Sequence, residues 1–131
     1  MSNNATSLKT SPNSIEAEKG VLGSILLDAQ NSIEKCLSKN VCPEAFFDPR
    51  HKVLFQSFLD MDKEKNPMDA VTIKNWLNDR DLLKVIGGED YLLLLQDSTI
   101  VPSHVESYSD IVMDKFLCRK LIKKSSDVID S

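Results

Sequence analysis

The stretch VIGGEDYLLLL, residues 85–95, decides how the chain folds, because it admits several different structures. Two adjacent glycines are followed by two acids, one tyrosine and four consecutive leucines. A phosphate-binding loop would need more glycines and a Lys-Ser or Lys-Thr pair, and none follows. Four leucines are far too few to cross a membrane. The remaining choice lies between a buried strand and the start of a helix.

Three observations favour the helix. Leucine is a strong helix former, and no β-branched residue interrupts residues 91–97. Glu89 and Asp90 fall in the first turn, where carboxylates complement the helix dipole and would repel a bound phosphate. The stretch therefore predicts a helix that begins after Gly87-Gly88. One face of it carries Tyr91, Leu92 and Leu95, with Leu94 beside them.

A further helix is predicted over residues 13–27. Asn13 and Glu16 fit a capping box, and the apolar residues that follow recur at helical spacing. Gly20 and Gly23 lie inside this helix, where each glycine costs ~1 kcal/mol relative to alanine. We therefore expect another helix to cross closely at these glycines.

The next segment is predicted to be a short helix over residues 31–39. Ile33 and Leu37 are expected to face inward, and Phe46 and Phe47 are expected to anchor the core. These positions together predict a second helix followed by a turn that is fixed by aromatic packing.

Two acids mark the starts of the following helices. Asp48, followed by Pro49, combines a capping carboxylate with proline at the first helical position, and this third helix is expected to end near Lys63. Asp69 caps a fourth helix. Its inward residues recur at i, i+3 and i+4: Ile73, Trp76 and Leu77.

The last helix is predicted over residues 103–130, after Pro102. Its apolar side has a heptad-like spacing, carried by Ile111, Cys118, Ile122, Ser125 and Ile129. Because no segment reads as a strand, the predicted class is all-α, a compact bundle of about five helices plus one long helix. We predict a disordered tail over 1–12, a globular head over 13–101 and a helical arm over 102–131.

Composition narrows the functional classes. The chain has 131 residues, 27% charged residues and a net charge of −4, which argues against tight binding to a phosphate backbone. The three cysteines lack zinc-site spacing and do not form an even disulfide set. No signal peptide or membrane span is present in the sequence. A cytoplasmic location is therefore expected.

No catalytic constellation emerges from the residues. His51 and His104 are interpreted as surface or packing histidines, because neither has an evident partner for catalysis. Trp76 is expected in the core. Acidic pairs are expected on exposed helix faces: Glu16 with Glu18, Asp60 with Asp62, and Glu89 with Asp90. The basic residues at 119–120 and 123–124 are expected to form one charged helix face rather than a phosphate site.

Five patterns, in this order and spacing, resemble one family. They are SIEAEKGVLGSILLD (14–28), PEAFFDPRHKVLFQSF (43–58), NPMDAVTIKNWL (66–77), GGEDYLLLL (87–95) and ESYSDIVMDKFLCRKLI (106–122). Together they resemble the N-terminal domain of the bacterial replicative DNA helicases of the DnaB family, over residues 12–130.

The resemblance implies a helical head followed by a two-helix hairpin. Hairpins of this family pair between copies of the chain, and the paired domains form a collar, a trimer of dimers, on a hexameric ring. The collar would contact a DnaG-type primase, and helicase loaders would act on the ring. ATP and Mg²⁺ would belong to a separate motor domain, so no cofactor is expected here.

The sequence departs from the complete family protein in two respects. It contains no Walker A motif, so we expect no ATP hydrolysis and no catalysis by this chain. The chain also stops where the second arm of the hairpin would begin. The resemblance therefore implies that residue 131 is an imposed boundary, and that the apolar face of the last helix has lost its partner.

The resemblance also suggests site residues. Candidates for the primase contact are Glu16, Tyr91, Ile122 and Val128. Candidates for the interface between copies are Leu117, Leu121, Ile122, Val128 and Ile129. For Tyr91 the alternative is core packing with its hydroxyl reaching solvent. For Ile122 and Val128 the alternative is burial in the hairpin.

Other functions remain open from the sequence. The chain could be the helicase-binding C-terminal domain of a primase, which resembles this domain in fold, or a generic helical protein-interaction domain. The patterns at 87–95 and 106–112 favour the helicase side. Single-stranded DNA binding is disfavoured by the acidic charge and the absence of interleaved exposed aromatics. An enzyme with His51 as its base has the weakest support.

Overall fold

The computed structural model describes residues 11–98 and 104–130, with side chains up to Ser125. Within these ranges the protein is all-α and contains no strand, which confirms the predicted class. The elements are α2 (Ile15–Leu27), α3 (Ala29–Ser38), the short 3-10 helix η1 (Pro43–Ala45), α4 (Pro49–Lys63), α5 (Ala70–Asp79), α6 (Gly88–Ser98) and α7 (Val105–Asp130). Most of the predicted tail, residues 1–10, lies outside the described residues.

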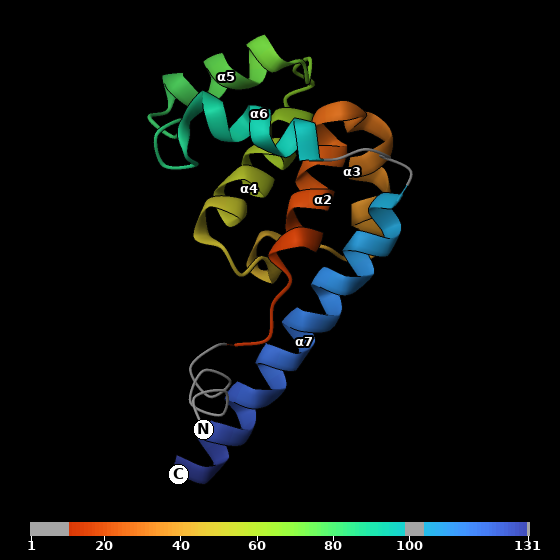
Figure 1. Cartoon of the computed structure of the whole chain (residues 1–131), viewed down its shortest axis with the longest axis vertical. Helices are drawn as coiled ribbons and strands as arrows, with labels where there is room; N and C mark the ends of the chain where they lie inside the picture. The colour runs from red at the N-terminus through yellow and green to blue at the C-terminus, as the bar shows by residue number, and fades with distance from the viewer. Residues whose placement is uncertain (1–10, 99–103, 131) are drawn as a thin grey trace.

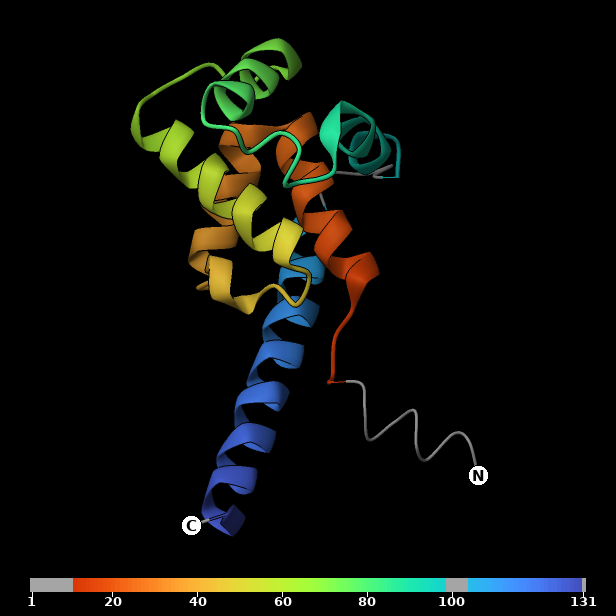
Figure 2. The same ribbon diagram turned by 90° about the vertical axis from the view of Figure 1, so that its left-hand side faces the viewer.

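The helices form a compact head from which one long helix projects (Figure 1). Helix α2 lies at the centre of the head and packs against α3, α4, α6 and α7. The N-terminal part of α7 lies against α2 and α3, and its distal half extends well beyond the head, as the turned view in Figure 2 also shows. The division into a head over 13–101 and an arm over 102–131 stays a prediction. In the structure, the first turns of α7 pack against the head.

Capping side chains fix where the helices begin. The Asp48 carboxylate accepts from the backbone N–H of Arg50 at 2.9 Å, and Asp69 accepts from Thr72 N–H at 2.9 Å, so both predicted caps are confirmed. The capping box predicted at Asn13 is wrong. Ser14 is the cap of α2, since its hydroxyl accepts from Ala17 N–H at 3.2 Å.

The glycine pair stands at a helix start, as predicted, although Gly88 is already the first residue of the helix. Gly87 and Gly88 have φ angles of +106° and +80°, a left-handed backbone that glycine adopts without the strain of a side chain. A Cβ at Gly87 would also lie 2.9 Å from Tyr91 Cβ. Helix α6 then begins at Gly88 and buries Tyr91, Leu92 and Leu95, as predicted.

Two predicted core positions are wrong. Helix α3 begins at Ala29, and its buried residues are Ser32, Ile33 and Cys36. Leu37 lies about 100° further round the helix than Cys36 and is exposed. Phe46 is fully buried, but Phe47 is 39% exposed. Adjacent residues in extended backbone point in opposite directions, so Phe46 and Phe47 cannot both enter the core.

The close helix crossing predicted at Gly20 is present. The ring of Tyr108, on α7, lies against Gly20, and a Cβ built there would come within 2.5 Å of Tyr108 Cδ2. Val105, Ser109 and Val112 are buried at the same interface. Glycine at this position therefore lets α7 approach the central helix α2.

We predict that Gly20→Ala destabilises the protein by roughly 1–2 kcal/mol, because the clash with Tyr108 outweighs the better helix propensity of alanine. In a Tyr108→Ala background the same substitution should be neutral or stabilising, because the ring is gone. Urea unfolding of the four proteins measures both effects. A similar loss in both backgrounds would show that the Tyr108 contact does not set the requirement for glycine.

Candidate functional site

A buried polar cluster links three helices of the head. Glu18 on α2, His51 on α4 and Tyr91 on α6 are 1%, 0% and 8% exposed. A Glu18 carboxylate oxygen lies 2.7 Å from His51 Nδ1, and His51 Nε2 lies 2.6 Å from the Tyr91 hydroxyl. Glu18 also accepts from the backbone N–H groups of Phe47, at 2.7 Å, and Asp48, at 3.3 Å.

The donors and acceptors of this cluster are assigned from their partners. Burial raises the pKa of the Tyr91 hydroxyl, so it stays protonated and can donate to His51 Nε2. The opposite nitrogen, Nδ1, then carries the imidazole proton and donates it to Glu18. We assign this tautomer from the hydrogen-bond network. Each nitrogen of the His51 ring thereby has a hydrogen-bond partner.

The cluster corrects one prediction and one alternative. Glu18 was expected on an exposed face, but it lies one helical turn from Val21 and Leu22, on the apolar stripe of α2. A carboxylate within such a stripe is the sequence signal for a buried acid with dedicated partners. In the core-packing alternative for Tyr91 the hydroxyl reached solvent, whereas in the structure it meets His51.

An ion pair covers one side of this cluster. Asp48 Oδ2 lies 2.8 Å from Arg50 Nη2, and the Arg50 guanidinium lies 4.1 Å from the centre of the Tyr91 ring. The hydrogen bond from Arg50 holds the pKa of Asp48 below its ordinary value. Asp48 therefore caps α4 as a carboxylate and also orders the arginine over Tyr91.

The described residues do not assemble a catalytic or metal-binding centre. His51 and Glu18 are enclosed by protein, so no substrate atom can reach the imidazole in this conformation. No group of three or more His, Cys, Asp or Glu side chains in the described part is placed to hold a metal. Cys36 is buried beside Ser109, and burial raises the pKa of its thiol to about 11.

The predicted contact residues are scattered. Glu16 is exposed on α2 and lies 3.7 Å from Lys19 Nζ, whereas Tyr91 is buried. On α7, three large side chains are more than half exposed: Leu117, Leu121 and Ile122. The side chains of Val128 and Ile129 lie outside the described residues. No described helix is both long and apolar enough to cross a membrane.

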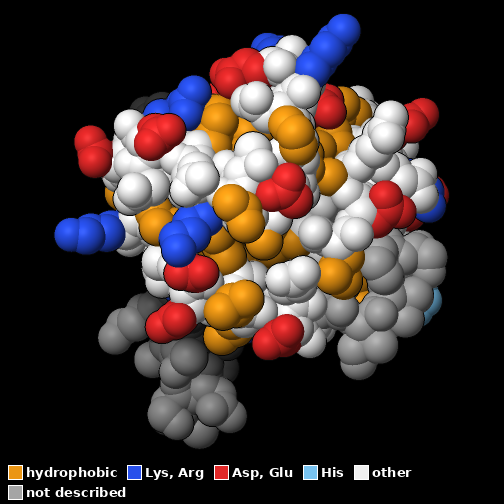
Figure 3. Space-filling model, turned by 90° about the horizontal axis from the view of Figure 1, so that it is seen from above, with side chains coloured by type: hydrophobic (Ala, Val, Ile, Leu, Met, Phe, Trp, Pro, Cys, Tyr) orange, Lys and Arg blue, Asp and Glu red, His pale blue; other side chains and the backbone are white. Residues whose placement is uncertain are grey.

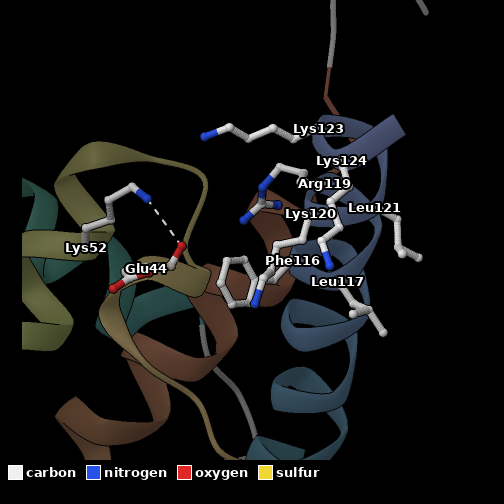
Figure 4. A pocket seen from close by; sticks show the side chains of 9 residues that line it. All are labelled: Glu44, Lys52, Phe116, Leu117, Arg119, Lys120, Leu121, Lys123 and Lys124. Carbon is white, nitrogen blue, oxygen red and sulfur yellow. Dashed lines mark hydrogen bonds between the residues drawn. The ribbon is translucent and has the colours of Figure 1, made fainter. Parts of the chain in front are cut away.

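A groove of about 650 Å³ runs along the exposed half of α7 (Figure 4). We call it the basic groove. It is lined by Glu44, Lys52, Phe116, Leu117, Arg119, Lys120, Leu121, Lys123 and Lys124. The basic run of α7 was predicted, but the contribution of Lys52 from α4 was not. Lys52 is far from α7 in the sequence, so the sequence alone does not show that it lies beside the basic residues of α7.

Arg119 ties this half of α7 to the head. Its guanidinium donates to the carbonyl oxygens of Pro12, at 2.8 Å, and Ala45, at 2.7 Å. Lys39 on α3 adds an ion pair to Asp110, with 3.1 Å between Nζ and Oδ1. Beyond Arg119, the described residues of α7 have no further hydrogen bond or ion pair to the head.

Comparisons with known proteins agree on one family. A family model described as the DnaB-like helicase N-terminal domain matches residues 10–114. The replicative DNA helicase DnaB of Nostoc is 35% identical over 118 residues, 90% of this chain but 13% of its own length. The chain thus spans only a small part of that relative.

Two solved structures are also similar. The N-terminal domain of DnaB helicase from Mycobacterium tuberculosis has a TM-score of 0.87 and 32% identity, covering 92% of this chain and 85% of that one. A DnaB-like replicative helicase, described together with its interactions with primase, has a TM-score of 0.77 and 26% identity. That match covers 89% of this chain and 27% of the helicase.

We predict that Tyr91→Phe destabilises the protein by roughly 1–2 kcal/mol, because it leaves buried His51 Nε2 without a donor. Glu18→Ala should cost more, about 3–5 kcal/mol, since the buried His51 ring and two part-buried backbone N–H groups lose their acceptor. Tyr108→Phe is the control, because no hydrogen bond holds that hydroxyl to the described residues. Chemical denaturation measures all three. Equal effects of the two Tyr→Phe changes would contradict the assigned network.

A second prediction concerns pH. Asp48→Asn keeps a good capping side chain but removes the charge that Arg50 binds, and it should lower stability by about 1 kcal/mol at pH 7. Because the folded pKa of Asp48 is depressed, its charge stabilises above the unfolded value near 3.9 and ceases to do so as pH falls through the folded value. The difference from the parent should therefore shrink by pH 3. A loss that is independent of pH would contradict this, and Asp62→Asn is the exposed control.

Proposed function

The chain belongs to the family of DnaB-like helicase N-terminal domains, and from that premise we propose that it is the collar domain of a hexameric, ATP-dependent replicative DNA helicase. In this role it joins copies of the chain and presents a surface to a DnaG-type primase. The helicase loader is a further expected partner. Catalysis, ATP and Mg²⁺ belong to a motor domain outside the matched residues.

One observation carries the proposal. Leu117, Leu121 and Ile122 are 56%, 58% and 56% exposed on a helix whose opposite side ties it to the head. Exposed apolar residues four apart on one helix, as Leu117 and Leu121 are, are typical of a surface that another helix covers. The related helicase described with its interactions with primase supports the assignment of one such partner.

The helicase side is favoured over the primase side. The matching family model and the relatives are helicases. This agrees with the family that the five sequence patterns resemble. A generic helical interaction domain would share the exposed leucines but would not explain a likeness that extends over 90% of the chain. The helicase domain is therefore the function that we propose.

The test is sedimentation equilibrium of the chain, alone and with the C-terminal domain of the primase from the same organism. We expect self-association or primase binding that is at least tenfold weaker in Leu117→Ser/Leu121→Ser/Ile122→Ser. Three apolar contacts of roughly 1 kcal/mol each would account for such a loss.

The matched control removes exposed apolar groups elsewhere. Val71→Ser/Val85→Ser changes side chains that are 68% and 52% exposed on other parts of the head. This control should bind as the parent does. A parent chain that neither self-associates nor binds the primase domain at high concentration would defeat the proposal.

A further inference from the structure

The basic groove gathers positive charge that the surrounding protein does not neutralise. Five of its lining residues are cations, and Glu44 is the one acid among them. The cations are Lys52, Arg119, Lys120, Lys123 and Lys124. Within the described part of the chain, none of these five side chains forms an ion pair. Five positive charges less one negative charge give the groove a net charge of +4.

The two walls of the groove come from separate elements. Lys52 stands on α4 and the other cations stand on α7, where the basic run alone would form only a charged helix face. Lys52 and Lys123 extend from opposite walls toward the space between them (Figure 4). Lys52 Nζ also donates to the carbonyl oxygen of Glu44, at 3.3 Å, which holds it beside the opening. An anion between the walls would therefore meet ammonium groups from both sides.

Arg119 adds a charge whose position is fixed. Its guanidinium donates to the carbonyl oxygens of Pro12 and Ala45, and both of these acceptors are uncharged. A guanidinium has five N–H donors, so donors remain for a further acceptor. The charge of Arg119 is thus held in place beside the groove without being neutralised.

The basic groove and the exposed leucines of α7 lie on different sides of the helix. At 100° per residue, Arg119 lies about 160° round the helix from both Leu117 and Leu121. Figure 4 shows the two leucines directed away from Lys52. A helix that covers the leucines therefore need not enter the space between Lys52 and Lys123.

The charge distribution suits a compact anion rather than a long one. The groove has a volume of about 650 Å³, within the range of pockets that hold small molecules. Because the whole chain carries −4 and the groove carries +4, the residues outside the groove carry −8. At the remote end of the head, acidic side chains lie among hydrophobic ones (Figure 3). A long polyanion that leaves the groove would be repelled by the rest of the surface, whereas a short anion would not reach it.

The groove also lacks a platform on which nucleic-acid bases could stack. Its one aromatic residue is Phe116, and Lys120 Nζ and the Arg119 guanidinium lie 5.1 and 5.8 Å from the centre of that ring. Single-stranded nucleic acids bind by stacking successive bases on aromatic side chains. Phe116 is better placed to hold the two cations than to stack a base.

We propose that the basic groove binds a short phosphate chain, either as inorganic triphosphate or as the triphosphate of a nucleotide. Lysine binds phosphate as a compact point charge. Lys52 and Lys123 would hold the anion from the two walls, and Arg119 would approach it from α7. The bound anion would link α4 of the head to the projecting part of α7. This inference does not depend on the self-association or the primase binding proposed above.

Isothermal titration calorimetry with sodium tripolyphosphate, without Mg²⁺, tests the proposal. We expect one site per chain, with an affinity that falls as salt rises, because exposed charges are screened. Lys52→Gln/Lys123→Gln should bind roughly tenfold more weakly, since both walls lose a charge-assisted contact. The anion should also raise the melting temperature of the parent, because it binds the folded chain and not the unfolded one.

ATP distinguishes the two sources of the phosphate chain. The sequence has no Walker A motif to bind the nucleotide elsewhere. An affinity for ATP equal to or below that for tripolyphosphate would assign the phosphate chain alone as the ligand. A higher affinity for ATP, weakened in Lys52→Gln/Lys123→Gln, would assign a nucleotide. Either result supports the site.

Two controls separate the site from general charge and from self-association. Lys63→Gln/Lys84→Gln removes two exposed lysines outside the groove and should bind tripolyphosphate as the parent does. Leu117→Ser/Leu121→Ser/Ile122→Ser should also retain the anion, even where self-association is lost. Loss of the anion in this variant would contradict a site within one chain. Circular dichroism checks that each variant is folded.

Three further results would overturn the inference. Absence of tripolyphosphate binding to the parent at low salt would remove the site. Equal weakening by Lys63→Gln/Lys84→Gln would show that general attraction, and not the groove, holds the anion. Tighter binding of a single-stranded oligonucleotide than of tripolyphosphate, lost in Lys52→Gln/Lys123→Gln, would assign the groove to nucleic acid.

Discussion

The head depends on one buried carboxylate. Glu18 projects from the central helix α2 and accepts hydrogen bonds from the start of α4 and from the His51 ring, which in turn reaches Tyr91 on α6. A buried charge is tolerated only where donors surround it, so the chain must bring α4 and α6 to one point on α2. The apolar core determines that these helices pack, and Glu18 determines where along α2 they meet.

This constraint also explains the arrangement around Asp48. The segment that gives two backbone N–H groups to Glu18 is the segment that begins α4, so the cap of α4 is held at a fixed place. Arg50 then bridges Asp48 and the face of Tyr91. Capping, ion pairing and aromatic packing thereby share the same few residues, and each one orients the next.

The sequence predicted the helices better than it predicted their polar contacts. Asp48 and Asp69 were identifiable as caps because a capping carboxylate acts on its own neighbours, and Gly20 was identifiable because glycine inside a helix needs a reason. Leu37 and Phe47 were misplaced because the phase of a short helix or a turn is set by tertiary packing. The partnership of Glu18, His51 and Tyr91 joins residues 33 and 40 positions apart, which local periodicity cannot reveal.

The candidate surfaces show the same limit. Leu117, Leu121 and Ile122 stay predicted interface residues, and all three are exposed on the structure. The groove was not predicted, because Lys52 and Glu44 come from another part of the chain. Tyr91 was offered as a contact residue by its place in a recognised pattern, yet a pattern records a family likeness and does not distinguish a buried anchor from a surface contact.

The continuity of α7 has a mechanical consequence. The helix runs unbroken for 26 residues, and Arg119 is the last of its described residues that hydrogen-bonds to the head. At 1.5 Å per residue the part beyond Arg119 is a lever arm of roughly 16 Å. A head that tilts by about 10° would swing the far end of that lever by roughly 3 Å, about half of a helical turn. Small rotations of the head are thereby amplified into displacements large enough to change which side chains of a neighbouring helix are in register.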